Sequence, residues 1–362
     1  MCVFGTRPEA IKMCPLVQEL KRRSGFKTVV CVTGQHREML KQVLQVFQIE
    51  PEHDLSVMRE EQDLFDITTS VLNGMKQVLE EERPDIVLVH GDTSTTFAAA
   101  LACFYLHIPI GHVEAGLRTY DLNAPYPEEM NREFVGLVGS VHFAPTEGAR
   151  QNLLREGRSP ESIFVTGNTV IDALHYTVRA DYTHPELTWA ADSRLVLLTV
   201  HRRENQGEPM RRIFRVIRAV VDEHLDVKVI YPVHLNPAVR AMAREMLGGH
   251  PRIHMIEPLN VIDFHNFMSR CCMVLSDSGG VQEEAPAFGK PVLVLRDTTE
   301  RPEGVEAGTL RLVGTQEQEI HDRFSELLDD PQKYQAMSCA RNPYGDGTAS
   351  IRIADALMKL PL

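Results

Sequence analysis

The sequence contains no apolar run of about 18 residues, the length that a transmembrane helix requires, although 43% of its 362 residues are hydrophobic. It therefore predicts a globular protein without a membrane span. Its seven cysteines are odd in number and form no Cys-x-x-Cys pair, so neither a disulfide framework nor a zinc site is indicated. Met1 stands shortly before a glycine-containing turn and leaves no room for a secretory signal. A cytoplasmic enzyme is expected.

The sequence also lacks an excess of positive charge, since its formal net charge is -12, whereas a nucleic-acid surface would be expected to carry a basic stripe. A nucleic-acid partner is therefore not expected. Any anionic ligand must be held by a few local cations or by the N-terminal ends of helices. The length of the chain favours two domains.

Short β-branched runs alternate with longer segments of helical period along the whole chain. The runs of the first half are KTVVCVTG, DIVLVHG, IPIGHVEA, VHFAPT and SIFVTGN, and those of the second half are RLVLLTVH, VKVIYPVH, IHMIEP, CMVLSDSG, KPVLVLRD and TLRLVGT. This pattern predicts two Rossmann-like, doubly wound α/β domains, 1–167 and 168–344, joined near residues 168–190. Ligands of such domains lie outside the carboxyl ends of the strands, so the active site is expected in the cleft between the domains.

Two acids, Asp92 and Glu114, each follow an apolar run directly. A metal site with His90 and His112 is one interpretation, although no His-Glu-x-x-His motif occurs. Helix capping is a second interpretation, and it suits Asp92 better than Glu114. The third is acid/base catalysis, because carboxylates in a cleft of low dielectric have raised pKa values.

The segment LSDSGGVQEEAP indicates an anion site in the second half. Ser278, Gly279 and Gly280 open a helix directly after a strand, which presents backbone N–H groups to a phosphate. Glu284 is four residues beyond Gly280, hence on the same helical face, where its carboxylate can accept hydrogen bonds from a ribose diol. Arg301 follows nearby, with Arg296, as a cation for the same anion.

The turn FGTRPEAIK also joins a strand to a helix, with Pro8 at the first helical position. It lacks the Gly-x-Gly-x-x-Gly spacing and is therefore poor evidence for a dinucleotide. Arg7 at the turn and Lys12 one helical turn later could both reach the cleft.

A series of long motifs resembles the non-hydrolysing UDP-N-acetylglucosamine 2-epimerases of bacterial type. In order, the motifs are FGTRPEAIK, TGQHREML, LVHGDT, GHVEAGLRT, PEEMNR, GNTVIDAL, HRREN, YPVHLNP, SDSGGVQEEAP, GKPVLVLRDTTERPE and NPYGDG. The resemblance implies a glycosyltransferase-B-like fold whose C-terminal helix, about 345–362, packs back on the first domain. It also implies a homodimer that interconverts UDP-GlcNAc and UDP-ManNAc for surface polysaccharides, without NAD or another cofactor and without a metal.

The resemblance further implies roles for individual residues. The catalytic set is Asp92, Glu114, Glu128 and His201. We expect Asp92 and Glu128 to be the opposed base and acid, Glu114 to tune or position them, and His201 to support the leaving diphosphate. The substrate-binding set is Arg7, Lys12, Phe264, Ser278, Gly279, Gly280, Glu284 and Arg301, with Phe264 against the uracil.

The sequence departs from the family pattern in three places. The first strand is cut to MCVF, so either the start is misassigned or the edge of the sheet is shortened. Leu259 stands where a Gln often contacts the uracil. Many members have a second, allosteric UDP-GlcNAc site, which Gln35, Gln62, Arg202 and His234 match. Glu38 and Glu61 replace a Gln and an Arg there, so we expect reduced activation by UDP-GlcNAc.

Three other functions remain open at this stage. A hydrolysing 2-epimerase would release free ManNAc and UDP. A glycosyltransferase of the same fold would transfer the sugar to an acceptor. A nucleotide-sugar sensor would bind without turnover. Incubation with UDP-GlcNAc in deuterated water separates these functions, because only reversible epimerisation places deuterium at C2 of a UDP-sugar.

Overall fold

The computed structural model describes residues 1–34, 37–59 and 62–360, and it divides into two compact units. Unit 1 comprises Met1–Tyr176 and Tyr344–Leu362, and unit 2 comprises Thr177–Pro343. Residues 168–176, which the sequence-based prediction assigned to the second domain, group with unit 1. The reason is that α7 (Thr169–Thr177) is tied there through Asp172, whose carboxylate accepts the backbone N–H groups of Ala349 and Ser350.

Unit 1 contains a fully parallel sheet with the strand order β3-β2-β1-β4-β5-β6-β7 in the described part of the chain. Its strands are β1 (Cys2–Phe4), β2 (Val30–Val32), β3 (His53–Asp54), β4 (Val87–His90), β5 (Ile110–Val113), β6 (Val141–Ala144) and β7 (Ile163–Val165). Its helices are α1 (Arg7–Arg22), α2 (Arg37–Val46), α3 (Leu64–Glu82), α4 (Ser94–Tyr105), α5 (Glu128–Val138), α6 (Glu147–Arg155), α7 and α16 (Ala349–Leu357), with the 3₁₀ turn η1 (Pro160–Ser162).

The short first strand lies at the centre of this sheet, between β2 and β4. A shortened sheet edge, one of the two explanations of the truncated MCVF segment, is therefore wrong. Strand β3 was not predicted, because its two residues lack the β-branched character that marks the other strands.

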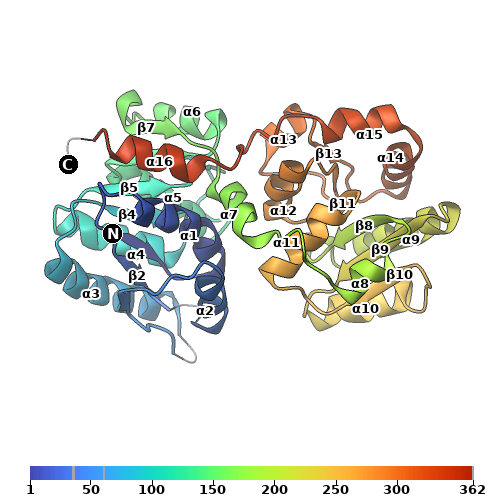
Figure 1. Ribbon diagram of the computed structural model, residues 1–362, viewed down its shortest axis with the longest axis horizontal. Helices are drawn as coiled ribbons and strands as arrows, with labels where there is room; N and C mark the ends of the chain where they lie inside the picture. Colours follow the sequence, from blue (N-terminus) through green and yellow to red (C-terminus); the bar gives the residue numbers. More distant parts are fainter. Residues whose placement is uncertain (35–36, 60–61, 361–362) are drawn as a thin grey trace. The chain divides into compact units, whose positions relative to one another are not determined.

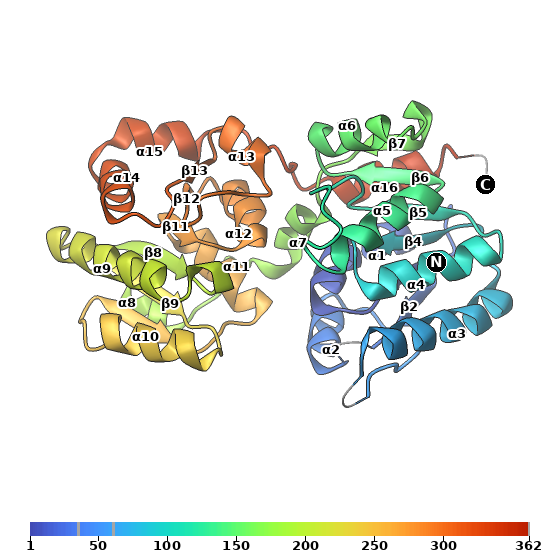
Figure 2. The same ribbon diagram turned by 180° about the vertical axis from the view of Figure 1, so that it is seen from behind.

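Helices cover both faces of the unit 1 sheet. Figure 2 shows α3, α4 and α5 side by side on one face. Beneath them lies a core that includes Val3, Val87 and Val89 from the strands and Val71 and Met75 from α3. On the other face α16, coloured red in Figure 1, lies beside α1, so the C-terminus returns to the first unit.

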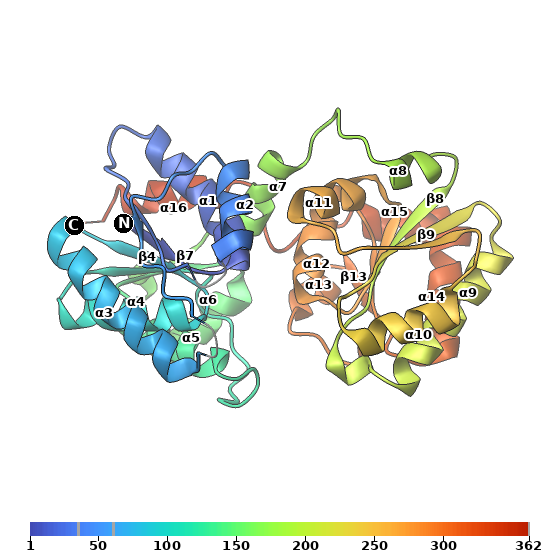
Figure 3. The same cartoon turned by 90° about the horizontal axis from the view of Figure 1, so that it is seen from below.

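Unit 2 repeats the same parallel arrangement, with the order β10-β9-β8-β11-β12-β13. Its strands are β8 (Arg194–Thr199), β9 (Val227–Pro232), β10 (Ile253–Ile256), β11 (Met273–Ser276), β12 (Val292–Val294) and β13 (Leu310–Leu312). Its helices are α8 (Pro185–Trp189), α9 (Glu208–Glu223), α10 (Pro237–Leu247), α11 (Val261–Arg270), α12 (Gly279–Glu284), α13 (Pro302–Glu306), α14 (Glu317–Asp329) and α15 (Pro331–Ser338), with the 3₁₀ turns η2 (Arg203–Asn205) and η3 (Ala285–Phe288). Figure 3 shows α9 packed between α10 and α14.

Both sheets thus have the Rossmann-like order that the alternating pattern predicts. In each, the order reverses beside the first strand of the unit, between β1 and β4 and between β8 and β11. The loops that leave such neighbouring strands diverge to opposite faces of the sheet, which opens a crevice at their carboxyl ends. Arg7, Asp92, His201 and Ser278 follow these four strands, and Glu114 follows the adjacent strand β5.

None of the helices in the described residues is long and apolar enough to cross a membrane.

Candidate active site

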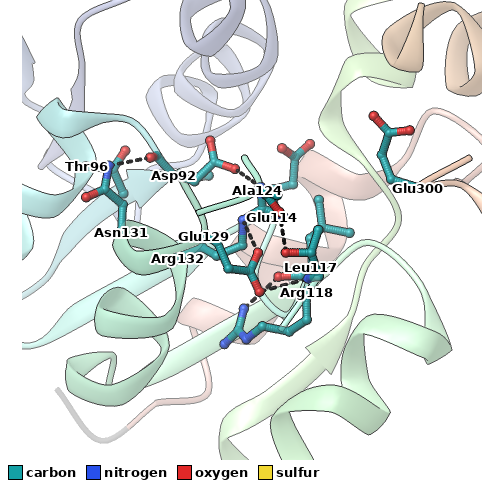
Figure 4. A network of polar contacts seen from close by, with 12 residues as sticks. Asp92, Thr96, Glu114, Leu117, Arg118, Ala124, Glu129, Asn131, Arg132 and Glu300 are labelled. Carbon is teal, nitrogen blue, oxygen red and sulfur yellow. Dashed lines mark hydrogen bonds and ion pairs between the residues drawn. The ribbon is translucent and has the colours of Figure 1, made fainter. Parts of the chain in front are cut away.

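Asp92 follows β4 and its side chain faces α5. One carboxylate oxygen lies 2.9 Å from Nη2 of Arg132, and the Asp92 carbonyl accepts an N–H of the Asn131 side chain at 2.9 Å (Figure 4). The capping interpretation of Asp92 is wrong, because the N-cap of α4 is Thr93, whose hydroxyl accepts the Thr96 N–H at 3.1 Å. The Asp92 carboxylate is thus directed to a cation rather than to the helix.

The pKa of Asp92 is raised from 3.8 to about 6. Burial is the main cause, because it disfavours the ionised carboxylate. The positive charge of Arg132 opposes this rise, the negative charge of Glu114 adds to it, Lys12 opposes it and Glu128 adds to it. Asp92 can therefore gain or lose a proton near neutral pH, as a general acid or base must.

Glu114 follows β5 with φ of 62°, in the left-handed region that residues other than glycine rarely adopt. Its Oε2 accepts hydrogen bonds from Lys12 Nζ and from Asn168 Nδ2, the latter at 2.7 Å, and lies 3.8 Å from His90 Nε2. Such strained backbone persists where the surroundings fix it, and it clusters at functional sites. Lys12, which the sequence predicts to bind substrate, is the ion-pair partner of Glu114 in this structure.

Glu128, the third acid, is the first residue of α5 and is half-buried. Its negative charge contributes to the raised pKa of Asp92. The next residue, Glu129, is fully buried and accepts the backbone N–H groups of Thr119 and Tyr120, both at 2.8 Å. Its other oxygen lies 3.4 Å from Arg132 Nε, so one carboxylate anchors the loop before α5 and steadies the guanidinium that faces Asp92 (Figure 4).

Arg7 is the first residue of α1, at the turn after β1. A buried carboxylate, Glu9, connects this turn with the loop that carries Asp92. Its Oε2 accepts the N–H groups of Gly5 (3.0 Å) and Thr6 (2.7 Å). Its Oε1 accepts the hydroxyls of Thr93 (2.7 Å) and Thr96 (3.1 Å).

No group of three or more His, Cys, Asp or Glu side chains within the described ranges has the arrangement to hold a metal ion. The two histidines of the metal interpretation do not converge on one point: His112 Nε2 lies 2.8 Å from the Gly91 carbonyl, whereas His90 Nε2 lies 3.8 Å from Glu114 Oε2. Burial lowers the pKa of His90 to about 4, so its ring is neutral at pH 7.

In unit 2, His201 follows β8 and is held by Asp277, which follows the neighbouring strand β11. The fully buried Asp277 carboxylate accepts the backbone N–H groups of His201 (2.9 Å) and Arg202 (2.8 Å) and an N–H of the Asn205 side chain (3.0 Å). Its Oδ1 also lies 3.3 Å from His201 Nδ1. Asp277 thus fixes both the backbone and the ring of His201.

The His201 ring stacks on the His234 ring with centroids 5.3 Å apart. Burial lowers the pKa of His201, the Asp277 carboxylate opposes this effect, and the charges of His234 and Arg202 add to it. The ring is therefore neutral at pH 7, and an anion bound beside it would favour its protonation.

Ser278 to Gly280 begin α12 at the end of β11. A Cβ added to Gly279 would meet Arg202 Nη2 at 3.7 Å and Glu300 Oε1 at 3.8 Å, which are ordinary contacts. The internal packing of unit 2 therefore does not require glycine there, and the absence of a side chain leaves the backbone N–H groups accessible to a phosphate.

Glu284 lies on the same face of α12 as Gly280, as the helical spacing predicts. Its Oε1 would be 3.6 Å from a Cβ at Gly280, and its Oε2 is 3.5 Å from Nε2 of the buried His265. His265 Nδ1 in turn lies 2.8 Å from the Thr177 hydroxyl. Two side chains, His265 and behind it Thr177, therefore hold the carboxylate predicted to bind ribose.

Three cations predicted to bind the anion or an allosteric ligand are already paired with acids in this structure. Arg301 donates to the buried Glu283 carboxylate, and Arg202 Nη2 lies 3.3 Å from Glu300. Arg296 pairs with Glu204 at 2.6 Å and also with Glu300. Binding of an anion by Arg202 or Arg301 would thus compete with these carboxylates.

The residues predicted for the uracil contact and for the allosteric site have different environments. Phe264 and Leu259 pack against the apolar core of unit 2. The Gln62 amide hydrogen-bonds within its own loop, to the Arg59 N–H and the Val57 carbonyl, both at 2.7 Å. Gln35, Glu61 and the side chain of Glu38, all assigned to the possible allosteric site, lie outside the described residues.

Sequence reasoning missed three residues of these sites. They are Arg132, which faces Asp92, Asn168, which donates to Glu114, and Asp277, which holds His201. Each lies within a motif already singled out, but its role depends on a partner at least 39 residues away in the chain.

Comparison with known proteins agrees with this arrangement. The family profile described as UDP-N-acetylglucosamine 2-epimerase matches residues 18–358. UDP-N-acetylglucosamine 2-epimerase of Bacillus subtilis is 58% identical over 358 residues, covering 99% of this chain and 94% of the relative. The Escherichia coli K12 protein of the same name is 51% identical, with 99% and 97% covered.

Solved structures show the same likeness. The crystal structure of UDP-GlcNAc 2-epimerase from Neisseria meningitidis bound to UDP-GlcNAc has a TM-score of 0.89 and 47% identity, and 99% of each chain is covered. The fold, the order of the motifs and the near-complete coverage lead to one conclusion. The chain belongs to the UDP-N-acetylglucosamine 2-epimerase family.

Proposed function

We propose that this protein interconverts UDP-GlcNAc and UDP-ManNAc by the non-hydrolysing route, inverting the configuration at C2 of the sugar. The observation that carries the proposal is the Asp92 carboxylate, whose pKa of about 6 suits proton transfer and whose neighbours include two further acids. The high identity to named UDP-N-acetylglucosamine 2-epimerases supports the substrate class.

The chemistry explains why several acids are needed. The hydrogen at C2 is not next to a carbonyl, so direct removal would leave an unstabilised carbanion. In elimination, a base takes the C2 proton while the bond between C1 and the UDP oxygen breaks, and that electron pair leaves with the diphosphate. A C1=C2 double bond forms, giving 2-acetamidoglucal and UDP. Re-addition of UDP at C1, with protonation of C2 from the opposite face, completes the inversion.

In this proposal the acids of unit 1 handle the protons. Asp92 is the base for one face, because it is partly ionised near neutral pH. Glu128 serves the opposite face from the start of α5. Glu114 sets the electrostatics of Asp92 and is itself held by Lys12. Arg7, at the turn after the neighbouring strand β1, binds the substrate phosphate.

Unit 2 binds the UDP portion in the same proposal. The N–H groups of Ser278, Gly279 and Gly280 hold phosphate, with Arg301 beside them, and Glu284 accepts the ribose hydroxyls. Phe264 lies against the uracil. His201 becomes an imidazolium when the diphosphate binds, because this anion acts on its pKa in the same direction as Asp277. It then stabilises the charge that develops on the leaving group.

Incubation with UDP-GlcNAc in deuterated water tests the proposal. We expect UDP-ManNAc with deuterium at C2 and persistence of the UDP-sugars at equilibrium. Accumulation of free ManNAc and UDP would indicate a hydrolysing enzyme instead. Transfer to an acceptor without an epimerised product would indicate a glycosyltransferase, and absence of both turnover and exchange would indicate a sensor.

Single variants then assign the protons. We expect Asp92→Asn to abolish C2 exchange while UDP binding persists, and Glu114→Gln to slow exchange and UDP release together. Asp85→Asn is the matched control, because Asp85 is an exposed acid just before the same strand β4. Equal loss of exchange in Asp85→Asn would show that the assay reports overall charge rather than the site.

We further propose a cytoplasmic homodimer, as the family resemblance implies. Sedimentation equilibrium of the full chain would measure the mass of the assembly, and fractionation of cells would locate it. A monomer at micromolar concentration would contradict the first part of this proposal.

A further inference from the structure

Asn168 has a contact with the acid set that the proposed function does not assign. It is buried, with 2% of its surface exposed, and stands between β7 and α7. Its Nδ2 donates to Oε2 of Glu114 at 2.7 Å, across 54 residues of sequence. A buried amide in this position fixes the direction of the carboxylate that it meets.

Glu114 needs such support because its backbone conformation is energetically unfavourable. Its φ of 62° is a conformation that a residue with a Cβ adopts only when neighbouring contacts hold it. Lys12 and Asn168 both donate to the same oxygen. Lys12 reaches it with a flexible side chain, whereas the planar amide of Asn168 leaves few alternative geometries.

Asn168 is itself held from three directions. Its Oδ1 accepts the Val170 N–H at 3.1 Å and so caps α7. Its own N–H donates to the Tyr344 carbonyl at 2.7 Å. Gly167, with φ of 87°, and Gly345 pass so closely that a Cβ on Gly167 would lie 3.2 Å from Gly345 Cα and 3.3 Å from the Tyr344 oxygen. The returning C-terminal segment therefore fixes the turn that carries Asn168.

We propose that Asn168 is a positioning residue that aims the Glu114 carboxylate for the reaction, and that the returning segment at Tyr344 and Gly345 fixes Asn168 in turn. This inference rests on the proposed function, in which Glu114 belongs to the catalytic set. It adds a residue and a structural cause: the NPYGDG motif acts on the site through the Gly167–Asn168 turn, although it contributes no side chain to the proton transfer.

Charged groups from several elements of the described residues surround this contact. Lys12 from α1, His90 from β4 and Asp92 from the following loop face Glu114. Arg352 of α16 lies behind the turn, where it donates to the Thr166 carbonyl at 3.0 Å. Its guanidinium also pairs with Asp346 at 2.7 Å.

Two substitutions separate the positioning role from the capping role of Asn168. Asn168→Ser keeps an oxygen that caps α7, since Ser and Asn are comparable N-caps, but it removes the amide N–H that donates to Glu114 and puts only a shorter hydroxyl in its place. Asn168→Asp also keeps the cap, and it replaces the donor by a second carboxylate. Asn73→Asp, at an exposed position of α3, is the control for the added charge.

We expect Asn168→Ser to lower kcat by about 10- to 100-fold, because misplacement of a catalytic group by about 1 Å has effects of this size. The KM for UDP-GlcNAc should stay within about twofold, since UDP is bound by other residues. The variant should unfold at a lower temperature than the parent, because a hydrogen bond to a buried carboxylate is lost, but α7 should stay folded because its cap is retained.

Asn168→Asp provides a readout that a purely structural role would not give. At pH 8 the two carboxylates repel, and kcat should fall further than in Asn168→Ser. When the pH is lowered toward 6 they share a proton, and the protonated side chain can again donate to Glu114. The ratio of variant to parent kcat should therefore rise as the pH falls, whereas the ratio for Asn73→Asp should stay near one at every pH.

A crystal structure of Asn168→Ser completes the test and is independent of activity. We expect the Glu114 carboxylate to leave its position while α7 stays in place. An unmoved Glu114, an unchanged kcat, or a pH-independent ratio for Asn168→Asp would overturn the inference. If the parent protein shows no C2 exchange, the proposed function fails, and the position of Glu114 in the variant structure still decides whether Asn168 positions it.

Discussion

The Arg132 guanidinium lies 2.9 Å from the Asp92 carboxylate, and burial raises the pKa of that same carboxylate to about 6. The two effects oppose each other. The cation alone would lower the pKa of Asp92 and keep it ionised at any physiological pH, whereas burial alone would raise this pKa further. Their balance places the titration of Asp92 close to neutrality.

Arg132→Gln should therefore move the acid limb of the kcat/KM profile. As the base, Asp92 must be ionised, so kcat/KM falls as the pH drops through about 6. Loss of Arg132 removes the cation that lowers this pKa, and the limb should shift upward by about one pH unit or more. The measurement is kcat/KM from pH 5 to 9.

Arg150→Gln is the control for Arg132→Gln, because Arg150 forms a surface pair with Glu147, at 2.8 Å, away from the acids. Its profile should match that of the parent. An unshifted limb in Arg132→Gln would show that Asp92 is not the base.

Gly116→Ala should strongly destabilise unit 1. Gly116 has φ of 90°, and a Cβ there would lie 2.2 Å from the Ala149 carbonyl oxygen. Left-handed strain alone costs about 1–2 kcal/mol, and the clash with a backbone atom brings the loss to about 4 kcal/mol or more. Urea unfolding of the parent and the variant would measure it.

Gly157→Ala separates strain from clash in that experiment. Gly157 has φ of 77°, but an added Cβ would meet nothing within 4 Å. Its loss should be limited to about 1–2 kcal/mol. Equal losses in the two variants would contradict the role assigned to the contact between Gly116 and Ala149.

Asp277→Asn should damage both stability and turnover. Asp277 accepts N–H groups from His201, Arg202 and Asn205, and an amide nitrogen in its place would face donors. The loss should be about 3 kcal/mol or more, because hydrogen bonds to buried charged groups are costly to break. Asp226→Asn, which removes an exposed pair with Arg194, should cost less than about 1 kcal/mol.

The turnover of Asp277→Asn should resemble that of His201→Gln. If Asp277 acts through His201, the double variant should be no slower than His201→Gln alone. Multiplicative losses would show that Asp277 has a separate effect on the reaction.

Glu284→Ala should remove the preference for ribose. In the parent, UDP should bind at least about 10-fold more tightly than 2′-deoxy-UDP and 3′-deoxy-UDP, because a site built for hydroxyls rejects ligands that lack them. In Glu284→Ala the three ligands should bind alike. Titration calorimetry measures this, with Glu306→Ala, an exposed acid of α13, as control. A retained preference would place the ribose elsewhere.

The kinetics with UDP-ManNAc alone should be hyperbolic. In the sequence, Glu38 and Glu61 stand at positions where the family pattern often has a Gln and an Arg, and an acid near a diphosphate should weaken the binding of a second UDP-GlcNAc. Initial rates over a range of UDP-ManNAc concentrations would measure the curve. Sigmoidal kinetics relieved by trace UDP-GlcNAc would show that the activation is retained.

Periodicity predicted the fold of both units well, because parallel strands buried on both faces are marked by continuous apolar runs. DIVLVHG contains β4, and LFDITTSVLNGMKQVLEEE coincides with α3. The two-residue strand β3 escaped because it has no such run. The cap of α4 was misread as Asp92, since an acid and a threonine stand side by side and both can cap a helix.

The contacts of the site could be predicted only in part. That Asp92 and Glu114 lie at strand ends followed from the pattern, but the pairing of Asp92 with Arg132 depends on how α5 approaches β4. The contact between Asn168 and Glu114 spans 54 residues and is set by tertiary packing. A signal for Arg132 existed in its spacing, because it stands four residues after Glu128 and so shares a helical face with it.

The Glu9 carboxylate also joins two loops into one unit. Its hydrogen bonds with Thr93 and Thr96 span 84 and 87 positions, so they link the turn after β1 to the loop after β4. The turn that carries Arg7 and the loop that carries Asp92 should then open and close as one cooperative unit in amide hydrogen exchange. A partly unfolded chain that has lost this link would lose the proposed phosphate binding by Arg7 and the proposed proton transfer by Asp92 together.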